Sequence, residues 1–304
     1  MADTLITRSP VDDPGNPAAS LAEADGLPAA PAGRQSRWRA GLGRRPAGLV
    51  ALAVLVALYL IAFGGPLLYR VSPTDANALA TNLPAGGAHL LGTDELGRDE
   101  LARLLAGGRL SLTLGVFAVL ITICLGTAVG LLAGFYRGAT EMVLMRLVDA
   151  AMAIPAFFLI LIEVTVFGNA PPVIIAVIGV TYWPQVARLM HGETLALRER
   201  EFVEASIALG ASRLRLMARH ILPHLLPSML VMATLAVAWA ILTESALSFL
   251  GLGIQPPDAS WGSLLQNAQT YVFLDPALAI FPGLCIAVTV LAFNILGDTL
   301  RDVL

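Results

Sequence analysis

The sequence contains no lysine, and all 19 of its basic residues are arginine. Without lysine the chain lacks the phosphate-binding loop G-x-x-x-x-G-K-[ST], and it cannot form a Schiff base with a carbonyl substrate. Charge is scarce as well, since 13% of the 304 residues are charged, against roughly a quarter in soluble domains. The composition therefore argues against an ordinary soluble domain, and any use of ATP requires another chain to bind it.

Cysteine and histidine are also rare. The two cysteines, Cys124 and Cys285, each lie inside an apolar block, where a small polarisable side chain packs well, and we interpret both as inert. Two of the four histidines, His220 and His224, have a helical spacing that could place both imidazoles on one face. Pro223 should interrupt that helix. We expect no metal site, no cofactor and no nucleic-acid partner.

Apolar residues make up 57% of the chain and gather in blocks of about 20 residues, the length with which an α-helix crosses ~30 Å of hydrocarbon. This pattern predicts an all-α membrane protein with six membrane-spanning helices. A turn at 168–171 should join the third and fourth into a hairpin. The predicted spans are 48–68, 110–135, 150–167, 172–187, 225–249 and 277–296.

The chain divides into three parts. Residues 1–43 are rich in Pro, Ala, Gly and Asp and have no periodic apolar pattern or signal-peptide layout, which predicts a disordered cytoplasmic tail. Residues 44–109 hold the first span and an extracytoplasmic segment. Residues 110–304 should form a core of five helices.

The arginines predict the orientation, because basic residues that flank spans are retained in the cytoplasm. With both termini in the cytoplasm, 15 of the 19 arginines lie on that side. The other four lie outside among acidic residues, and they are Arg70, Arg98, Arg103 and Arg109. The reverse orientation fits the rule far worse.

The extracytoplasmic segment 89–112 combines a turn at 92–94 with Leu101, Leu104 and Leu105 at helical spacing. This pattern predicts an amphipathic helix that lies on the outer face of the membrane. The alternative is direct contact with a substrate.

The polar stretch 191–223 is unusually long for a loop in a compact membrane protein. It reads as two short helices on either side of Gly210, which can adopt the positive φ that ends a helix. Ala205 and Ala208 have side chains small enough for another surface to approach closely. The pattern predicts a rigid, angular helix pair that projects into the cytoplasm and docks a partner, and the alternative is a solvated loop.

The same loop contains Glu204-Ala205-Ser206, then Gly210, then Ile221-Leu222-Pro223. This pattern resembles the EAA motif of ABC importer permeases. The chain departs from the consensus at Ser206, which replaces the second alanine, and in having no residue between Ile221 and Leu222. Neither departure removes the turn or the helix end.

Two further motifs extend the resemblance over residues 44–304. The first motif is His89-Leu90-Leu91-Gly92-Thr93-Asp94 with Gly97-Arg98-Asp99, and the second is ESALSFLGLG at 244–253 with Trp261-Gly262. Both are similar to sequences in C-type permeases of dipeptide, oligopeptide and nickel importers.

The resemblance implies a permease subunit of the bacterial inner membrane that pairs with a second related permease. Two ATPase subunits would dock on the cytoplasmic loops of the two permeases, which in this chain is 191–223, and an extracytoplasmic binding protein would deliver the cargo. The residues implied in coupling to the ATPases are Glu204, Ala205, Ser206, Gly210, Ile221 and Pro223. Di- or oligopeptides are the expected cargo, with nickel or another small solute as the alternative.

Three further residues are candidates for contact with the pathway or the binding protein, and each has a structural alternative. Glu163 lies mid-span, where a carboxylate must face water or protein, and an interhelical hydrogen bond would serve equally well. Glu244 could meet a peptide amino group or the binding protein, or pair helices. Trp261 could belong to the same surface, or be an aromatic anchor at the membrane interface.

Two other classes of protein compete with a transporter. A membrane-embedded enzyme would need a nucleophile or metal motif, and the sequence has no H-E-x-x-H, no Gly-x-Ser-Gly and no paired intramembrane aspartates. A passive channel would have no use for a docking loop. We therefore expect a transporter subunit that is not itself an enzyme.

Overall fold

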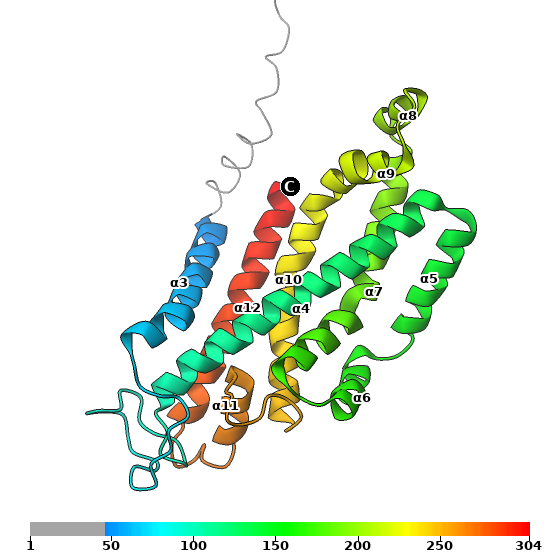
Figure 1. Ribbon diagram of the computed structural model, residues 1–304. Coiled ribbons are helices and arrows are strands. Elements are labelled where there is room, and N and C mark those ends of the chain that lie inside the picture. Colours follow the sequence, from blue (N-terminus) through cyan, green and yellow to red (C-terminus); the bar gives the residue numbers. More distant parts are fainter. Residues whose placement is uncertain (1–45) are drawn as a thin grey trace, which may run out of the picture. The chain divides into compact units, whose positions relative to one another are not determined.

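The computed structural model describes residues 46–304, which belong to one compact unit, 42–304. The predicted tail, 1–43, lies outside the described residues. Regular structure in the described part is helical, apart from two isolated β-bridges. The helices (Figure 1) are α3 (Pro46–Leu68), α4 (Glu100–Tyr136), α5 (Gly138–Met152), α6 (Ala156–Phe167), α7 (Pro171–Arg198), α8 (Glu201–Ala208), α9 (Arg213–Arg215), the π-helix η1 (Leu216–Ile221), α10 (Leu222–Phe249), α11 (Trp261–Ala268) and α12 (Ala277–Val303).

Five helical segments are long and apolar enough to cross a membrane, namely α3, α4, α7, Arg213–Phe249 and α12. The pair α5 and α6 makes a sixth if it is taken as one span, although its halves are bent by 83°. The all-helical membrane fold is thereby confirmed, but the prediction of an unbroken helix at 150–167 is wrong. Pro155 has no N–H to donate and disfavours helical backbone at Ile154, so the helix breaks there.

The second span is longer than predicted. Asp99 caps the N-terminus of α4 by accepting a hydrogen bond from the backbone N–H of Ala102 at 2.8 Å. Residues 100–112 are consequently the first turns of α4, while residues 89–99 form turns. The separate interfacial helix expected within 89–112 is therefore absent, because the cap starts a helix that continues without a break to Tyr136.

Small residues let α4 and α7 pack closely along most of their lengths. Gly126, Gly130 and Gly134 lie one helical turn apart on the face of α4 that meets α7. A Cβ built on Gly130 would lie only 2.4 Å from the backbone oxygen of Ala187. Glycine is needed wherever two helix backbones come this close.

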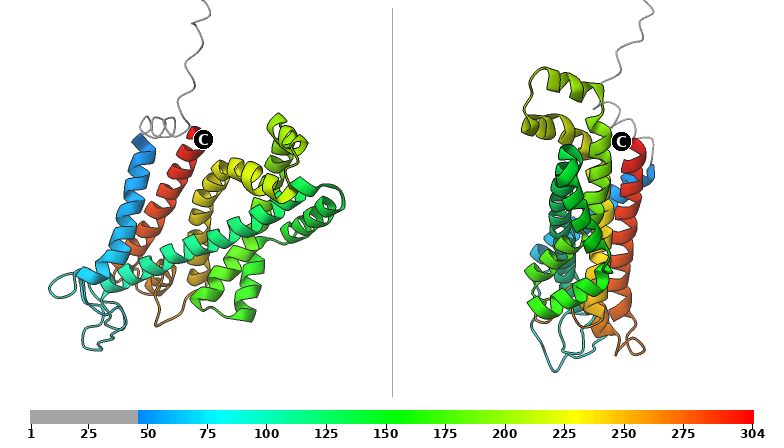
Figure 2. Two further views of the ribbon diagram at one scale, coloured as in Figure 1. Left: turned by 45° about the horizontal axis from the view of Figure 1, so that its top comes forward. Right: turned by 90° about the vertical axis from the view of Figure 1, so that its right-hand side faces the viewer.

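The membrane-length helices run between two opposite ends of the molecule. The first turn of α3 lies beside the last turns of α12, since a Cβ on Gly48 would be 2.5 Å from Thr299. Figure 1 shows the C-terminus and α8 at this same end, and the second view in Figure 2 agrees. The segment 69–99 and α11 lie at the opposite end.

The helix around Pro223 is continuous, contrary to the prediction that this proline would interrupt it. Arg213–Phe249 runs as one helical segment. The N–H of Leu222 bonds to the oxygen of Met217, five residues earlier, so the turn before Pro223 is π-helical. This wider turn accommodates a residue that has no N–H and whose ring would clash with the carbonyl of a tighter helix.

Candidate functional site

The 191–223 loop contains a helix held at a fixed angle. Helix α8 ends in a Schellman motif, in which the N–H of Ala211 bonds to the oxygen of Ser206 and the N–H of Gly210 bonds to that of Ile207. Gly210 has φ = +79°, as the sequence predicted. Space around its Cα is open, so only the backbone conformation demands glycine.

One side of α8 is anchored to the helices beneath it. Val203 is fully buried, and the ring of Phe202 stacks on that of His224 with centroids 5.0 Å apart. Ile221 is fully buried at the base of the loop. These contacts connect α8 to the start of α10.

The other side of α8 and the turn after it face away from the protein. Glu204 and Ala205 are exposed, while Ser206 is half-buried and donates a hydrogen bond to the oxygen of Phe202 at 2.7 Å. Apolar side chains are exposed beside them, with Leu209 at 88% and Leu214 at 72%. An exposed apolar surface next to a rigid turn is typical of a docking site.

The base of the loop also contacts the end of α4, which the sequence analysis did not foresee. Arg137 pairs with Glu199 at 2.5 Å. The guanidinium of Arg198 lies 5.8 Å from the ring centre of Phe135, and that of Arg213 lies 5.8 Å from that of Tyr136. Exposed ion pairs contribute little stability, but together these contacts hold the base of the loop against the end of α4.

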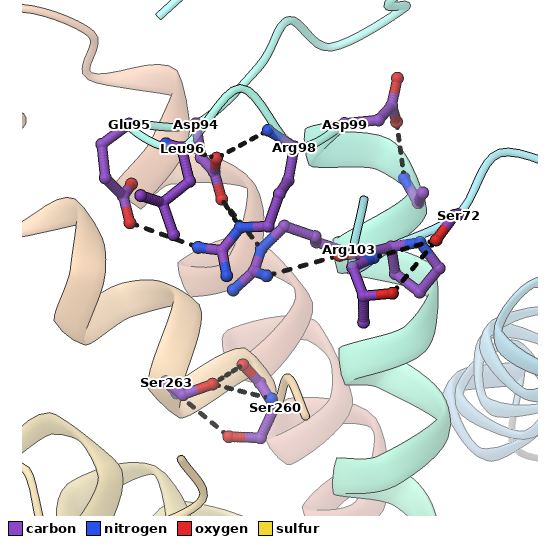
Figure 3. A network of polar contacts seen from close by, with 12 residues as sticks. Ser72, Asp94, Glu95, Leu96, Arg98, Asp99, Arg103, Ser260 and Ser263 are labelled. Carbon is purple, nitrogen blue, oxygen red and sulfur yellow. Dashed lines mark hydrogen bonds and ion pairs between the residues drawn. The ribbon is translucent and has the colours of Figure 1, made fainter. Parts of the chain in front are cut away.

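Glu244 lies fully buried near the end of α10 that meets α11. Its carboxyl group accepts hydrogen bonds from Ser260 at 2.6 Å and from Ser248 at 2.7 Å. Ser260 in turn caps α11 through the backbone N–H of Ser263 at 3.0 Å, and Figure 3 shows this pair. The geometry matches the helix-pairing alternative, since Glu244 connects α10 to α11.

Trp261 is buried inside the protein with 3% exposure, so its ring is not presented to lipid as that of an interfacial anchor would be. Its indole N–H donates to the oxygen of Leu104 at 3.1 Å, and its backbone N–H donates to Ser111 at 3.1 Å. The ring packs on Gly108, where a Cβ would lie 2.8 Å from it. Trp261 therefore joins α11 to α4.

Glu163 is half-buried on α6, where its carboxyl group accepts a hydrogen bond from the Thr181 hydroxyl at 2.9 Å. The bond joins α6 to α7 and corresponds to the interhelical alternative.

A buried ionic cluster lies at the start of α4, at the end where α11 lies (Figure 3). Arg98 and Arg103 both point at Asp94, with N–O distances of 2.7 and 3.2 Å, and none of the three is more than 4% exposed. Glu95 adds a contact to Arg98 at 3.3 Å. The sequence analysis expected these two arginines on the side that the charge rule disfavours, and the fold pairs both of them with carboxylates.

Asp99, in the same segment, has several polar partners. Besides capping α4, it accepts a hydrogen bond from the Tyr69 hydroxyl at 2.7 Å and lies 2.8 Å from Nδ1 of His89. Burial, together with the Asp99 carboxylate, raises the pKa of Tyr69 to about 12. Tyr69 therefore stays protonated near neutral pH and donates to Asp99.

A cavity of about 330 Å³ lies between α4, α7 and α10. Its lining is mostly apolar and includes three polar side chains, Thr122, Tyr182 and Gln185. Sequence reasoning missed it, although Tyr182 and Gln185 interrupt the apolar run of α7 and were the available signal.

Within residues 46–304, no group of three or more His, Cys, Asp or Glu side chains could hold a metal ion. Nδ1 of His224 instead lies 2.6 Å from the backbone oxygen of His220, as a donor within the same helix.

Comparison with a solved structure relates the fold to a known class. The chain matches a structure described as inward-facing conformations of the MetNI methionine ABC transporter with a TM-score of 0.53 and 19% identity. The match covers 66% of this chain and 96% of that one. The fold is thus one found in ABC transporters.

Sequence comparison gives the family. Residues 126–304 match the binding-protein-dependent transport system inner membrane component. The glutathione transport system permease protein GsiD of Pectobacterium atrosepticum is 39% identical over 271 residues, covering 88% of this chain and 89% of that protein. The oligopeptide transport system permease protein OppC of Haemophilus influenzae is 39% identical over 259 residues, covering 85% and 83%.

The chain belongs to the family of binding-protein-dependent inner membrane transport components, the permeases of ABC importers. It is accordingly a multi-pass protein of the inner membrane that works with other transport subunits, and it is not itself an enzyme.

Proposed function

We propose that this chain is one permease of a heterodimeric peptide importer, in which ATP is hydrolysed by two separate ATPase subunits. The names of two relatives that are 39% identical, a glutathione and an oligopeptide permease, support a peptide cargo. The observation that carries the coupling role is α8, a helix with an exposed small and apolar face, fixed at one angle by the turn at Gly210.

In this proposal the ATPases contact Glu204, Ala205 and Ser206. Movement of α8 passes through buried Val203 and the Phe202–His224 stack to α10, which begins at the π-helical turn. Rigid-body transmission of this kind drives alternating access, because packed helices move as units.

The orientation follows from the same assignment. The end that carries α8, the start of α3 and the C-terminus faces the cytoplasm, so both termini are cytoplasmic. The segment 69–99 and α11 then face outward, where the binding protein docks.

The residues proposed from sequence for cargo or binding-protein contact take different roles. Glu163 remains a candidate on the pathway, because it is only half-buried. Glu244 and Trp261 act through α11, since their hydrogen bonds position that outer helix against α10 and α4.

Two substitutions at Gly210 test the coupling role. Because φ is +79° and the surrounding space is open, Gly210→Val strains the backbone by about 1–3 kcal/mol. Gly210→Asn is the matched control, since asparagine tolerates this conformation. We expect normal membrane levels for both, with peptide uptake lost only in Gly210→Val.

A surface substitution tests the docking itself. Glu204→Lys reverses an exposed charge without touching the turn, so it should weaken retention of the ATPases during purification, more at low salt than at high salt. Wild-type uptake by both Gly210→Val and Glu204→Lys at matched expression would refute the coupling role.

A further inference from the structure

Two of the four arginines at the outer end have no acidic partner. Arg98 and Arg103 are buried and paired with Asp94. Arg70 and Arg109 are exposed, and no carboxylate within residues 46–304 forms an ion pair with either of them. The charge rule disfavours arginine on this side of the membrane, and the fold neutralises only the first two.

Arg109 of α4 lies against an apolar part of α3. Its guanidinium carbon is 5.7 Å from the ring centre of Phe63. Since α3 ends at Leu68, this contact lies about 8 Å before the end of the helix. Leu60 and Leu67, on either side of Phe63 in the chain, are 68% and 72% exposed. The guanidinium therefore lies at a level where the protein surface is still apolar, as it is where lipid covers it.

The guanidinium of Arg109 needs hydrogen-bond acceptors from outside the described chain. It carries five N–H donors, and its contact with the face of the Phe63 ring attracts the charge without accepting those hydrogens as a carbonyl or carboxylate would. A charged side chain is costly in an apolar environment, and arginines near helix ends avoid the cost by extending toward the headgroups.

A second cavity, of about 180 Å³, lies beside Arg109, between the end of α3, the segment after it and the first turns of α4. Among the described residues that line it, Arg109 alone is charged, and the hydroxyl of Tyr69 already donates to Asp99. The rest of the lining is apolar, and it consists of Pro66, Val71, Pro73, Ala102, Leu105 and Ala106. The site thus joins one unpaired cation to an apolar slot.

We propose that this second cavity binds an anionic phospholipid, whose phosphate bonds to Arg109 and one of whose acyl chains enters the apolar slot. Guanidinium and phosphate form paired, charge-assisted hydrogen bonds. Arg70, whose neighbours Tyr69 and Val71 line the cavity, adds a second positive charge at its rim. A phospholipid carries a phosphate and an acyl chain in one molecule, whereas a carboxylate of another subunit would leave the slot empty.

The inference goes beyond the proposed function, because it holds whatever the cargo is. The leaflet, which is the outer one, follows from the proposed orientation.

Photo-crosslinking with a lipid tests the site directly. The assembled complex is reconstituted into nanodiscs of phosphatidylcholine that contain a small share of phosphatidylglycerol with a diazirine on its acyl chain, close to the glycerol. After irradiation, mass spectrometry locates the labelled residues. The same diazirine on phosphatidylcholine measures attachment of a lipid without net negative charge.

We expect phosphatidylglycerol to label the lining, around Pro66 and Leu105, several-fold more than phosphatidylcholine does. Arg109→Gln should lower this labelling about fivefold, which is the contribution of one arginine near anionic headgroups. The matched control is Arg146→Gln on α5, since Arg146 is also exposed and without an acidic partner within 46–304 but does not line this cavity. It should leave the labelling of the cavity unchanged.

Three results would overturn the inference. The first is equal labelling of the lining by both lipids, and the second is unchanged labelling in Arg109→Gln. The third is an unlabelled lining while other lipid-facing residues of the chain are labelled, because another subunit then covers the cavity.

A second measurement needs no crosslinking. Phosphatidylglycerol added to the full chain in detergent should raise the melting temperature of the wild type and of Arg146→Gln, because a ligand that binds only the folded state stabilises it. Arg109→Gln should show a smaller rise, and Arg109→Lys, which keeps the charge but not the paired hydrogen bonds, should lie between the two. The same rise in all four proteins would overturn the inference.

Discussion

Gly130 is the place where α4 and α7 leave least room, and Gly130→Ala is the sharpest test of the packing. The new Cβ would lie 2.4 Å from the oxygen of Ala187, 2.7 Å from the Cβ of Met190 and 2.8 Å from the nitrogen of His191. All three atoms belong to α7, and two are backbone atoms. No side chain can rotate away, so the two helices must separate.

The size of the effect follows from these distances. Side-chain Cβ atoms essentially never approach other atoms closer than 3.0 Å, so α7 must shift by at least 0.6 Å, the difference between 3.0 and 2.4 Å. Inserting a methylene into a packed interface costs about 1–3 kcal/mol. Gly192 of α7 is the control, because a Cβ there meets nothing within 4 Å. Gly192→Ala should stabilise the helix by about 0.5–1 kcal/mol.

The assay is the melting temperature of the purified chain in detergent, followed by size-exclusion chromatography after heating. One kcal/mol shifts the melting temperature by roughly 2–4 °C in proteins of 150–250 residues. We expect Gly130→Ala to melt several degrees below wild type and Gly192→Ala at or slightly above it. If Gly130→Ala melts as high as Gly192→Ala, the close packing of α4 on α7 is wrong.

Three further predictions follow from other parts of the structure. The first uses single cysteines in a background without Cys124 and Cys285. Cysteine in place of Phe273, which is 99% exposed, should react with an impermeant thiol reagent on intact cells, whereas cysteine in place of Leu209 should react only after lysis. The reverse pattern would contradict the proposed orientation. Asp94→Asn leaves Arg98 and Arg103 buried without their shared carboxylate. It should therefore destabilise the protein by about 3–5 kcal/mol and lower its level in the membrane. Asp258→Asn, at an exposed position, is the control and should change neither. The purified chain alone should neither bind nor hydrolyse ATP, and turnover by a preparation of this polypeptide alone would overturn the division of labour with the ATPases.

Local signals were sufficient for several features. The apolar blocks located five of the spans, because crossing hydrocarbon depends on length and composition alone, with six of their ten ends within two residues and the other four short by 7–12 residues. The turn at Gly210 was predictable since only glycine adopts positive φ without strain. The extension of α4 to Glu100 was missed, although Asp99 at its start is a standard capping residue.

Other features needed the tertiary structure. Glu244 and Trp261 stood out in the sequence, but both had open alternatives, since nothing local to either residue says that Ser260 or Leu104 is its partner. Pro223 was misjudged because the widened turn that accommodates it depends on backbone geometry over the whole of η1.

The sequence by itself determined that this chain lies in the membrane, roughly where most of its spans run, where the 191–223 loop turns, and that it lacks the lysine-containing phosphate-binding loop. Those properties depend on residue type and short-range spacing. Only the tertiary structure decided which buried polar groups are paired, as Glu244 is with Ser260 and Ser248, and which helices line the cavity. The lining residues Ala118 and Ala240 are 122 positions apart in the chain, and they meet because α4, α7 and α10 cross at distances set by packing.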